Sequence, residues 1–176
     1  MLCDLALASS GAGLLLATGN VEGCIELWAI RDGVFQQLPA DSSALGGDAH
    51  VAVIDPGLED PLLLTANAVD GTLGFLTPLS DRAGVAERWP AGHTHPITAI
   101  AGVRHRTGDI LIASGDRHGD VLLCRSRADG TDPRPISRLS LGARILDIHL
   151  APDGSSMVWS SQGGLYLTLT PDPTRF

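Results

Sequence analysis

Four histidines, His93, His95, His105 and His118, form the densest group of side chains that could bind a metal ion. A zinc site needs three or four ligands that converge tetrahedrally and are held in place by further hydrogen bonds. Only His93 and His95 lie close together in the sequence. The choice between a metal site and a structural role therefore depends on the elements that position these residues.

Other reactive arrangements have no local motif to support them. Serine, histidine and aspartate all occur in numbers, but no Gly-x-Ser-x-Gly sequence is present, and residues 115–119, Gly-Asp-Arg-His-Gly, read as a strand turn. No glycine-rich segment leads from a strand into a helix, as a phosphate-binding loop would. We therefore expect no catalytic residue, no bound cofactor and no enzymatic activity.

The composition indicates a folded, acidic protein. The chain has 176 residues, 44% of them apolar and 18% charged, which suits one domain or slightly more and disfavours a disordered tail or a coiled coil. Its net charge is −8; residues 1–80 hold one Arg against ten acidic residues, whereas residues 81–176 hold eleven Arg against ten. Nonspecific nucleic-acid binding needs a basic surface that neutralises phosphates, so we expect no nucleic-acid partner.

Cysteine usage and hydropathy predict a cytoplasmic protein. Cys3, Cys24 and Cys124 are odd in number and form no Cys-x-x-Cys pair, which fits a reducing compartment. The apolar residues 5–17 follow Asp4 in place of a cationic start, and a Ser-Ser-Gly sequence interrupts them, so a signal peptide is disfavoured. No apolar run approaches the ~18 to 20 residues of a membrane-spanning helix, and we expect no membrane association.

A repeat of 48 residues organises most of the chain. Residues 14–23, 62–71 and 110–119 superimpose without a gap, so that the glycines that end them recur at this spacing. Residues 157–163 form a shorter fourth copy, whose final glycine follows 44 residues later. Repeats of about 20 to 50 residues are typical of solenoids and propellers.

Each copy contains short segments with the period-two alternation of β-strands. The first segments are 5–8, 51–54, 97–100 and 145–148; the repeated apolar runs come second; the third are 24–28, 72–76, 120–124 and 164–168; and a weaker fourth covers 34–38, 85–89 and 136–141. Turns rich in Gly, Pro, Asp and Ser link them, so consecutive strands form antiparallel hairpins. Parallel strands would need longer, usually helical crossovers, which are not predicted here.

The sequence thus predicts an all-β fold of β-propeller blades: about four antiparallel blades of four strands, the last one incomplete. We place the blades at residues 4–40, 48–90, 92–141 and 144–170, within a single propeller segment of residues 1–176. A sandwich or barrel is the competing all-β fold, but neither has a reason to repeat glycines in register.

The repeated segments resemble the WD-repeat family of β-propellers. In that family a Gly-His pair precedes the first strand, Ser or Thr lies on the second, Asp lies in the next turn and Trp ends the third strand; the four side chains form a hydrogen-bond network. The resemblance assigns such structural roles to eight residues: Thr18, Glu22, Trp28, His50, Asp70, His93, Ser114 and His118. It gives His93 a structural task, which favours structure over metal binding.

No copy holds the complete pattern. The departures are His118 at the Asp position and Cys124 at the Trp position of the third copy, and Ala66 and Leu76 in the second. Half-satisfied buried polar groups cost about 1 to 3 kcal/mol each. We therefore expect the blades to rely mainly on the packing of Leu, Ile, Val and Ala side chains.

The resemblance implies a non-catalytic scaffold for protein–protein interaction, with rigid sheets that hold variable loops. The alternative is a propeller with a small-molecule or hydrolytic site at the channel mouth. Such a site needs several His, Asp or Arg side chains that converge on the axis from different first strands. The first-strand segments offer almost nothing polar, so we expect protein partners, whose identity the sequence does not reveal.

The number of blades raises the question of how the ring closes, because propellers have typically four to eight blades. We favour a terminal piece of a longer propeller; the alternatives are two copies that pair into a ring of eight blades, and a self-contained ring of four. A half ring exposes apolar faces on its first and last blades, and such patches mark association sites. Self-association that completes the propeller is therefore among the expected interactions.

Overall fold

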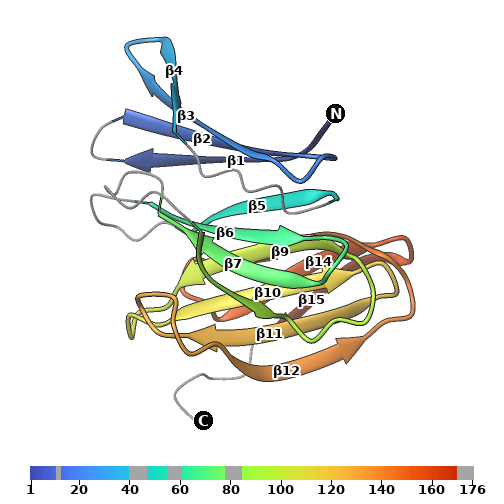
Figure 1. The fold of residues 1–176 in the computed structure, drawn as a ribbon. Helices are drawn as coiled ribbons and strands as arrows, with labels where there is room; N and C mark the ends of the chain where they lie inside the picture. The colour runs from blue at the N-terminus through green and yellow to red at the C-terminus, as the bar shows by residue number, and fades with distance from the viewer. Residues whose placement is uncertain (11–12, 40–46, 55–60, 78–84, 170–176) are drawn as a thin grey trace.

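The computed structural model describes residues 1–10, 13–39, 47–54, 61–77 and 85–169. Within these residues the chain forms fifteen β-strands in four separate antiparallel sheets and no helix (Figure 1). The all-β prediction is confirmed. The described part of the chain accordingly holds no helix with the length and apolar character needed to span a membrane.

In each sheet, strands that follow one another in the sequence are hydrogen-bonded neighbours. We call the sheets blades 1 to 4. Blade 1 holds β1 (Leu2–Ser10), β2 (Gly13–Asn20), β3 (Ile25–Arg31) and β4 (Val34–Leu38); blade 2 holds β5 (Ala49–Ile54), β6 (Leu62–Asn67), β7 (Thr72–Leu76) and β8 (Val85–Pro90); blade 3 holds β9 (Ile97–Arg104), β10 (Ile110–Asp116), β11 (Asp120–Ser126) and β12 (Arg134–Ser140); blade 4 holds β13 (Ile145–Leu150), β14 (Ser156–Ser161) and β15 (Gly164–Leu169). Within the described ranges, blade 4 therefore has three strands.

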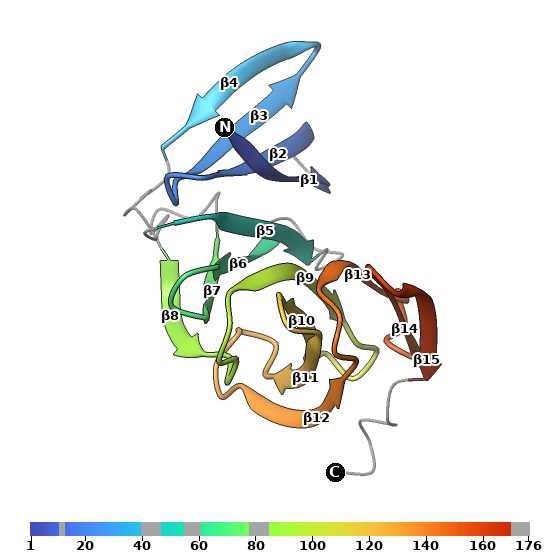
Figure 2. The same ribbon diagram turned by 90° about the vertical axis from the view of Figure 1, so that its right-hand side faces the viewer.

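The blades follow an arc with their first strands on the concave side (Figure 2). β5 contacts β1 on one side and β9 on the other, and β9 in turn contacts β13. The fourth strands, β4, β8 and β12, lie at the outer edge of their blades. This radial order of four-stranded meanders is that of a β-propeller, so the predicted fold class is confirmed.

The arc is not closed in the described part of the chain. Blade 1 packs against blade 2 and blade 4 packs against blade 3, with no comparable contact between blades 1 and 4. The alternative of a self-contained ring of four blades is therefore wrong for the described residues.

Three apolar clusters join the neighbouring blades. Each cluster contains a third-strand residue of one blade and a second-strand residue of the next: Leu27 with Leu63, Phe75 with Ile112, and Leu123 with Trp159. β6 and β10 are buried on both faces because their blades lie between two others, whereas β3 of blade 1 alternates between buried and more exposed residues. Every blade thus has two faces. We call the face toward the blade before it in the sequence the preceding-side face, and the face toward the blade after it the following-side face.

Blade 2 is shifted by one residue relative to the gapless alignment of the repeats. That alignment equates Leu64 with Ile112, yet Leu64 faces blade 3 and Ile112 faces blade 2 across the same cluster. Leu63 is the true equivalent of Ile112, because its side chain faces the preceding blade. Since side chains alternate along a strand, a shift of one residue exchanges the two faces. The gapless superposition predicted for this copy is therefore wrong.

Candidate functional site

A buried Ser–His–Asp network joins the second strand of blade 3 to the loop before its first strand. His93 lies in that loop; its Nδ1 is 3.1 Å from Oδ2 of Asp116, and its Nε2 is 2.8 Å from Oγ of Ser114. The side chains of His93 and Asp116 are fully buried, and Ser114 is 1% exposed. The connectivity is that of a hydrolase triad, but a serine sealed from solvent presents no nucleophile to a substrate.

Burial decides the protonation state of this network. Desolvation lowers the pKa of His93 below its ordinary value of 6.5, and the hydrogen bond and charge of Asp116 oppose this shift only in part. We assign a neutral imidazole whose Nδ1–H donates to Asp116 and whose Nε2 accepts the hydroxyl hydrogen of Ser114. Each polar atom of the network then has a partner.

Acidification should destabilise the protein through His93. In the unfolded chain this imidazole takes up a proton near pH 6.5, whereas the buried imidazole of the folded chain stays neutral to a lower pH. The free energy of unfolding therefore falls as the pH falls below about 6.5. One such group contributes a slope of at most about 1.4 kcal/mol per pH unit. Urea denaturation between about pH 7 and about pH 5 measures this slope, which His93→Gln should reduce. An unchanged slope in His93→Gln contradicts this account.

Two further histidines cover the network. The rings of His95 and His118 are stacked, with centroids 3.6 Å apart and planes inclined by 19°. Nδ1 of His95 lies 4.0 Å from the same Asp116 carboxylate, and its side chain is 39% exposed. His105 follows the opposite end of β9 and bonds Thr107 there. Among the described residues, no three His, Cys, Asp or Glu side chains are arranged to hold a metal ion.

Asp116 is central to this network, although the family resemblance did not assign it a role. Its Oδ1 accepts the backbone N–H groups of His118 and Asp120, at 2.9 and 3.0 Å, which fixes the turn between β10 and β11. His118, which the resemblance places at the Asp position, contributes its backbone N–H to this turn and stacks its ring on His95. Asp116 therefore supplies the carboxylate for both the turn and His93.

Side chains anchor the corresponding turn in every blade. Oδ1 of Asn20 accepts the N–H groups of Glu22 and Cys24, Oδ1 of Asn67 accepts those of Val69 and Asp70, and Oγ of Ser161 accepts that of Gly163. A backbone hydrogen bond then joins each turn to the residue that directly precedes the first strand of the blade: Val21 to Met1, Ala68 to Asp48, Arg117 to Pro96 and Gln162 to Arg144. We call these four turns the upper rim.

The other residues of the predicted network are placed as follows. Thr18 lies on β2, at the position that Ser114 occupies on β10; Glu22 lies in an anchored turn, and Trp28 is on β3, on the face turned away from blade 2. Asp70 accepts the N–H and the hydroxyl hydrogen of Thr72, at 2.9 and 2.7 Å. The structure thus brings His93 and Ser114 together and leaves these four residues within their own strands and turns.

Blade 2 holds two departures that the sequence pattern did not reveal. Its equivalent of Ser114 is Thr65, 1% exposed, whose hydroxyl donates to the carbonyl of Gly74 at 3.1 Å. The pattern had selected Ala66, one residue away, because of the shift described above. His50, proposed to replace the Gly-His pair, pairs instead with Asp4 of blade 1, with Nδ1 3.4 Å from Oδ2.

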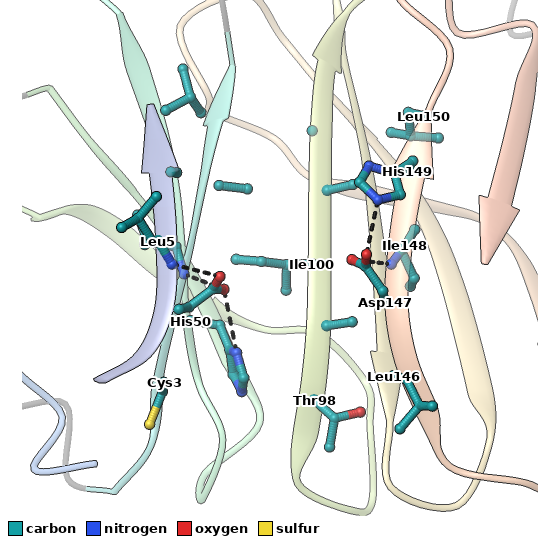
Figure 3. A pocket seen from close by; sticks show the side chains of 18 of the residues that line it. Cys3, Leu5, His50, Thr98, Ile100, Leu146, Asp147, Ile148, His149 and Leu150 are labelled. Carbon is teal, nitrogen blue, oxygen red and sulfur yellow. Dashed lines mark hydrogen bonds and ion pairs between the residues drawn. The ribbon is translucent and has the colours of Figure 1, made fainter. Parts of the chain in front are cut away.

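A cavity of about 470 Å³ lies on the concave side of the arc, where all four first strands contribute to its lining (Figure 3). Most of the lining is Ala, Leu, Val and Ile. Two carboxylate–imidazole pairs also lie there: Asp4–His50 and Asp147–His149, the latter at 2.9 Å. β1 and β5 begin earlier than the predicted segments, so they add Asp4 and His50 to a wall that the sequence analysis took to be almost apolar.

The polar groups of this wall are poorly suited to covalent catalysis. Burial, with a contribution from Asp48, raises the pKa of the Cys3 thiol, which keeps the sulfur protonated near neutral pH. The hydroxyl of Thr98 donates to the carbonyl of Ile145 at 2.6 Å. The wall can therefore bind polar groups of a ligand near its two carboxylate–imidazole pairs and apolar groups between them.

Comparison with solved structures identifies a similar chain in the structure titled "Crystal Structure of Mitotic Checkpoint Complex". The two chains superimpose with a TM-score of 0.70 and 18% sequence identity, over 97% of this chain and 51% of that one. This chain thus spans about half the length of its structural neighbour, and the likeness concerns the fold. No protein-family model and no curated protein matches the sequence.

Proposed function

We propose that this chain is a WD-repeat-like propeller segment that binds partner proteins through its upper rim and performs no catalysis. The anchored turns carry this proposal. Each turn is held by a side chain that lies where the turn begins and accepts backbone N–H groups of the turn: Asn20, Asn67, Asp116 and Ser161. Because these turns are ordered before binding, their exposed side chains meet a partner with little further loss of conformational freedom.

The other features of the chain agree with a binding role. The only Ser–His–Asp arrangement described above is buried, and we propose that His93 and Ser114 stabilise blade 3 as the family resemblance implies. The similar solved chain comes from a structure of a complex, which supports an assembly role here. The net charge of −8 favours protein over nucleic-acid partners, and three free cysteines support a cytoplasmic location.

Two rim residues are the first candidates for partner contact. Val69, at the tip of the turn between β6 and β7, is 70% exposed. Arg117, in the turn between β10 and β11, is exposed beside the stacked His95 and His118 rings. An exposed apolar side chain and an arginine on rigid turns are suited to anchor a protein interface.

Capture experiments with charge-changing variants test the rim. We expect the immobilised chain to retain a partner from extracts of its source cells, and Val69→Glu/Arg117→Glu to lose that partner at least tenfold, as quantified by mass spectrometry. Arg106→Glu is the control, because Arg106 is exposed in the turn at the opposite end of β9. Equal recovery with all three proteins, or loss with Arg106→Glu alone, contradicts a rim interface.

The cavity supports a second candidate function, a small-molecule site at the channel mouth. Its volume of about 470 Å³ lies in the range of about 300 to 1,000 Å³ that is usual for ligand pockets. A panel of small polar compounds should then raise the melting temperature of the wild-type chain but not that of Asp147→Asn. If no compound acts through Asp147, the rim remains the supported site.

A further inference from the structure

Blade 1 has a large apolar face against which none of the other described blades packs. Its preceding-side face holds six apolar residues, Leu5, Leu7, Leu14, Leu16, Trp28 and Ile30, beside Thr18 and Glu26. Leu7 is 54% exposed and Leu14 is 44% exposed, although both lie in regular strands next to buried residues. Figure 1 shows this blade at one end of the molecule, with blade 2 on one side and open space on the other. We call these six residues the blade-1 face.

Blade 4 carries the second open face. Trp159 stacks on Tyr166 on the side of blade 3, so the alternation of β15 points Leu165 and Leu167 the other way. These two leucines are 75% and 70% exposed. We call Leu165, Leu167 and the neighbouring Ser160 the blade-4 face. Asp147 and His149 share this side but lie along the cavity, where water reaches them.

The internal junctions show which faces fit together. In all three, a third-strand residue on the following side lies in one cluster with a second-strand residue on the preceding side of the next blade, as with Leu123 and Trp159. Aligned on the residues that anchor the turns, Leu167 of blade 4 lies at the position of Leu123, and Leu16 of blade 1 lies at the position of Met157, which is in the same cluster as Leu123. The blade-4 face is therefore suited to pack on a blade-1 face in the way that neighbouring blades pack within the chain.

We propose that two copies of this chain close into one ring of eight blades, in which the blade-4 face of each copy packs on the blade-1 face of the other. Both open faces of each copy are then covered by the same kind of junction that already occurs three times within the chain. The similar solved chain supports this size, because one copy covers 51% of it. This proposal is independent of the rim interface proposed above.

The charge distribution favours this pairing over a back-to-back dimer. Residues 1–80 carry ten acidic residues and one Arg, a net charge of −9, and residues 81–176 carry ten and eleven, a net charge of +1. Contact between two blade-1 faces would bring two halves of charge −9 together. Contact between blade 4 and blade 1 brings halves of −9 and +1 together, which removes most of this repulsion.

The area of the two junctions matches what a stable dimer needs. A face of four strands about 4.8 Å apart, each roughly six residues long at about 3.3 Å per residue, covers about 400 Å². Each copy contributes its four-stranded blade-1 face to one junction and its three-stranded blade-4 face to the other. Together the two faces bury roughly 700 Å² of each copy, close to the roughly 800 Å² per partner of a standard interface. One junction alone falls short, so ring closure through both is what stabilises the pair.

Light scattering after size-exclusion chromatography tests the assembly. We expect the wild-type chain to have twice its monomer mass of 18.3 kDa. Leu16→Lys and Leu165→Glu should each give the monomer mass, because by symmetry either change alters both junctions. Val69→Lys, an equally exposed change on the rim, should leave the dimer intact, and circular dichroism verifies that all variants retain their strands.

Mixing the two variants distinguishes this ring from other dimers. An equimolar mixture of Leu16→Lys and Leu165→Glu should recover the dimer, since one junction is then unaltered and the other holds both the introduced lysine and the introduced glutamate. A monomeric wild type, a polydisperse series of larger species, a dimer that persists in Leu165→Glu, or a mixture that stays monomeric overturns the proposal. If rim variants lose partner capture but remain dimeric, the ring proposal still holds.

Discussion

Replacing Asp116 by alanine is expected to lower the free energy of unfolding by about 3 to 5 kcal/mol. The change leaves three buried or partly buried donors unpaired: Nδ1–H of His93 and the backbone N–H groups of His118 and Asp120. It also removes the carboxylate that holds the buried His93 in its tautomer. Urea denaturation followed by far-ultraviolet circular dichroism measures the loss.

Asn20→Ala is the matched control, because Asn20 anchors the blade-1 turn with the same pair of backbone bonds, at 2.9 and 3.0 Å, but contacts no histidine in the described structure. It should cost about 1 to 2 kcal/mol. Asp116→Asn should fall between the two, since its amide oxygen retains the turn while its NH₂ group faces the Nδ1 of His93. Equal losses in Asp116→Ala and Asn20→Ala would show that the histidine network adds nothing.

The second large effect is expected for Phe75→Ala, at about 3 to 5 kcal/mol. Phe75 is 1% exposed in the cluster between blades 2 and 3, and its ring centroid lies 5.1 Å from that of Trp89. The turn before β12 covers the other side of the ring, where a Cβ on Gly130 would lie 2.5 Å from Cδ2 of Phe75. Removing the ring therefore opens a cavity that both blades line.

Phe75→Leu retains most of the volume and should cost less than about 1.5 kcal/mol. Native-state hydrogen exchange separates a local from a general effect: in Phe75→Ala, protection should fall in β7 and β11 before it falls in β2, which lies in the next junction. A uniform loss of protection across all blades contradicts a local role at this junction.

The arrangement of strands could be predicted from the sequence because it depends on local signals. Alternating runs such as 120–124 and turns such as 151–154 each act over a few residues, and β11 and β13 lie where these signals place them. Repetition then indicated blades, since a sheet that recurs at a constant interval must pack on its own copies. Neither inference needs knowledge of a distant contact.

The assignment of individual side chains failed where it depended on counting across a turn. The glycines at 71 and 119 align the second and third copies, but the turn from Asn67 to Gly71 is one residue longer than the turn from Asp116 to Gly119. This extra residue moved the predicted Ser/Thr position from Thr65 to Ala66. Aligning the copies on the polar residue that ends each second strand would have found Thr65 and Asp116.

The pairing of His50 with Asp4 could not be predicted from the sequence for a different reason. The two residues are 46 positions apart, in different blades, and their contact depends on how closely β1 approaches β5. Asp4 also accepts the backbone N–H of Val51 at 3.1 Å, so it joins two blades rather than two strands of one blade. A pattern defined within a single repeat does not represent such a bond.

The anchoring of each upper turn from behind has a consequence for how such a protein diverges. Because Asn20, Asn67, Asp116 and Ser161 hold the turns through backbone N–H groups, the shape of each turn does not depend on exposed tip side chains such as those of Val69 and Arg117. Substitutions at the tips can thus accumulate without loss of the blade. A lineage built on this plan can exchange one recognition specificity for another while its scaffold stays the same, even after sequence comparison no longer detects its relatives.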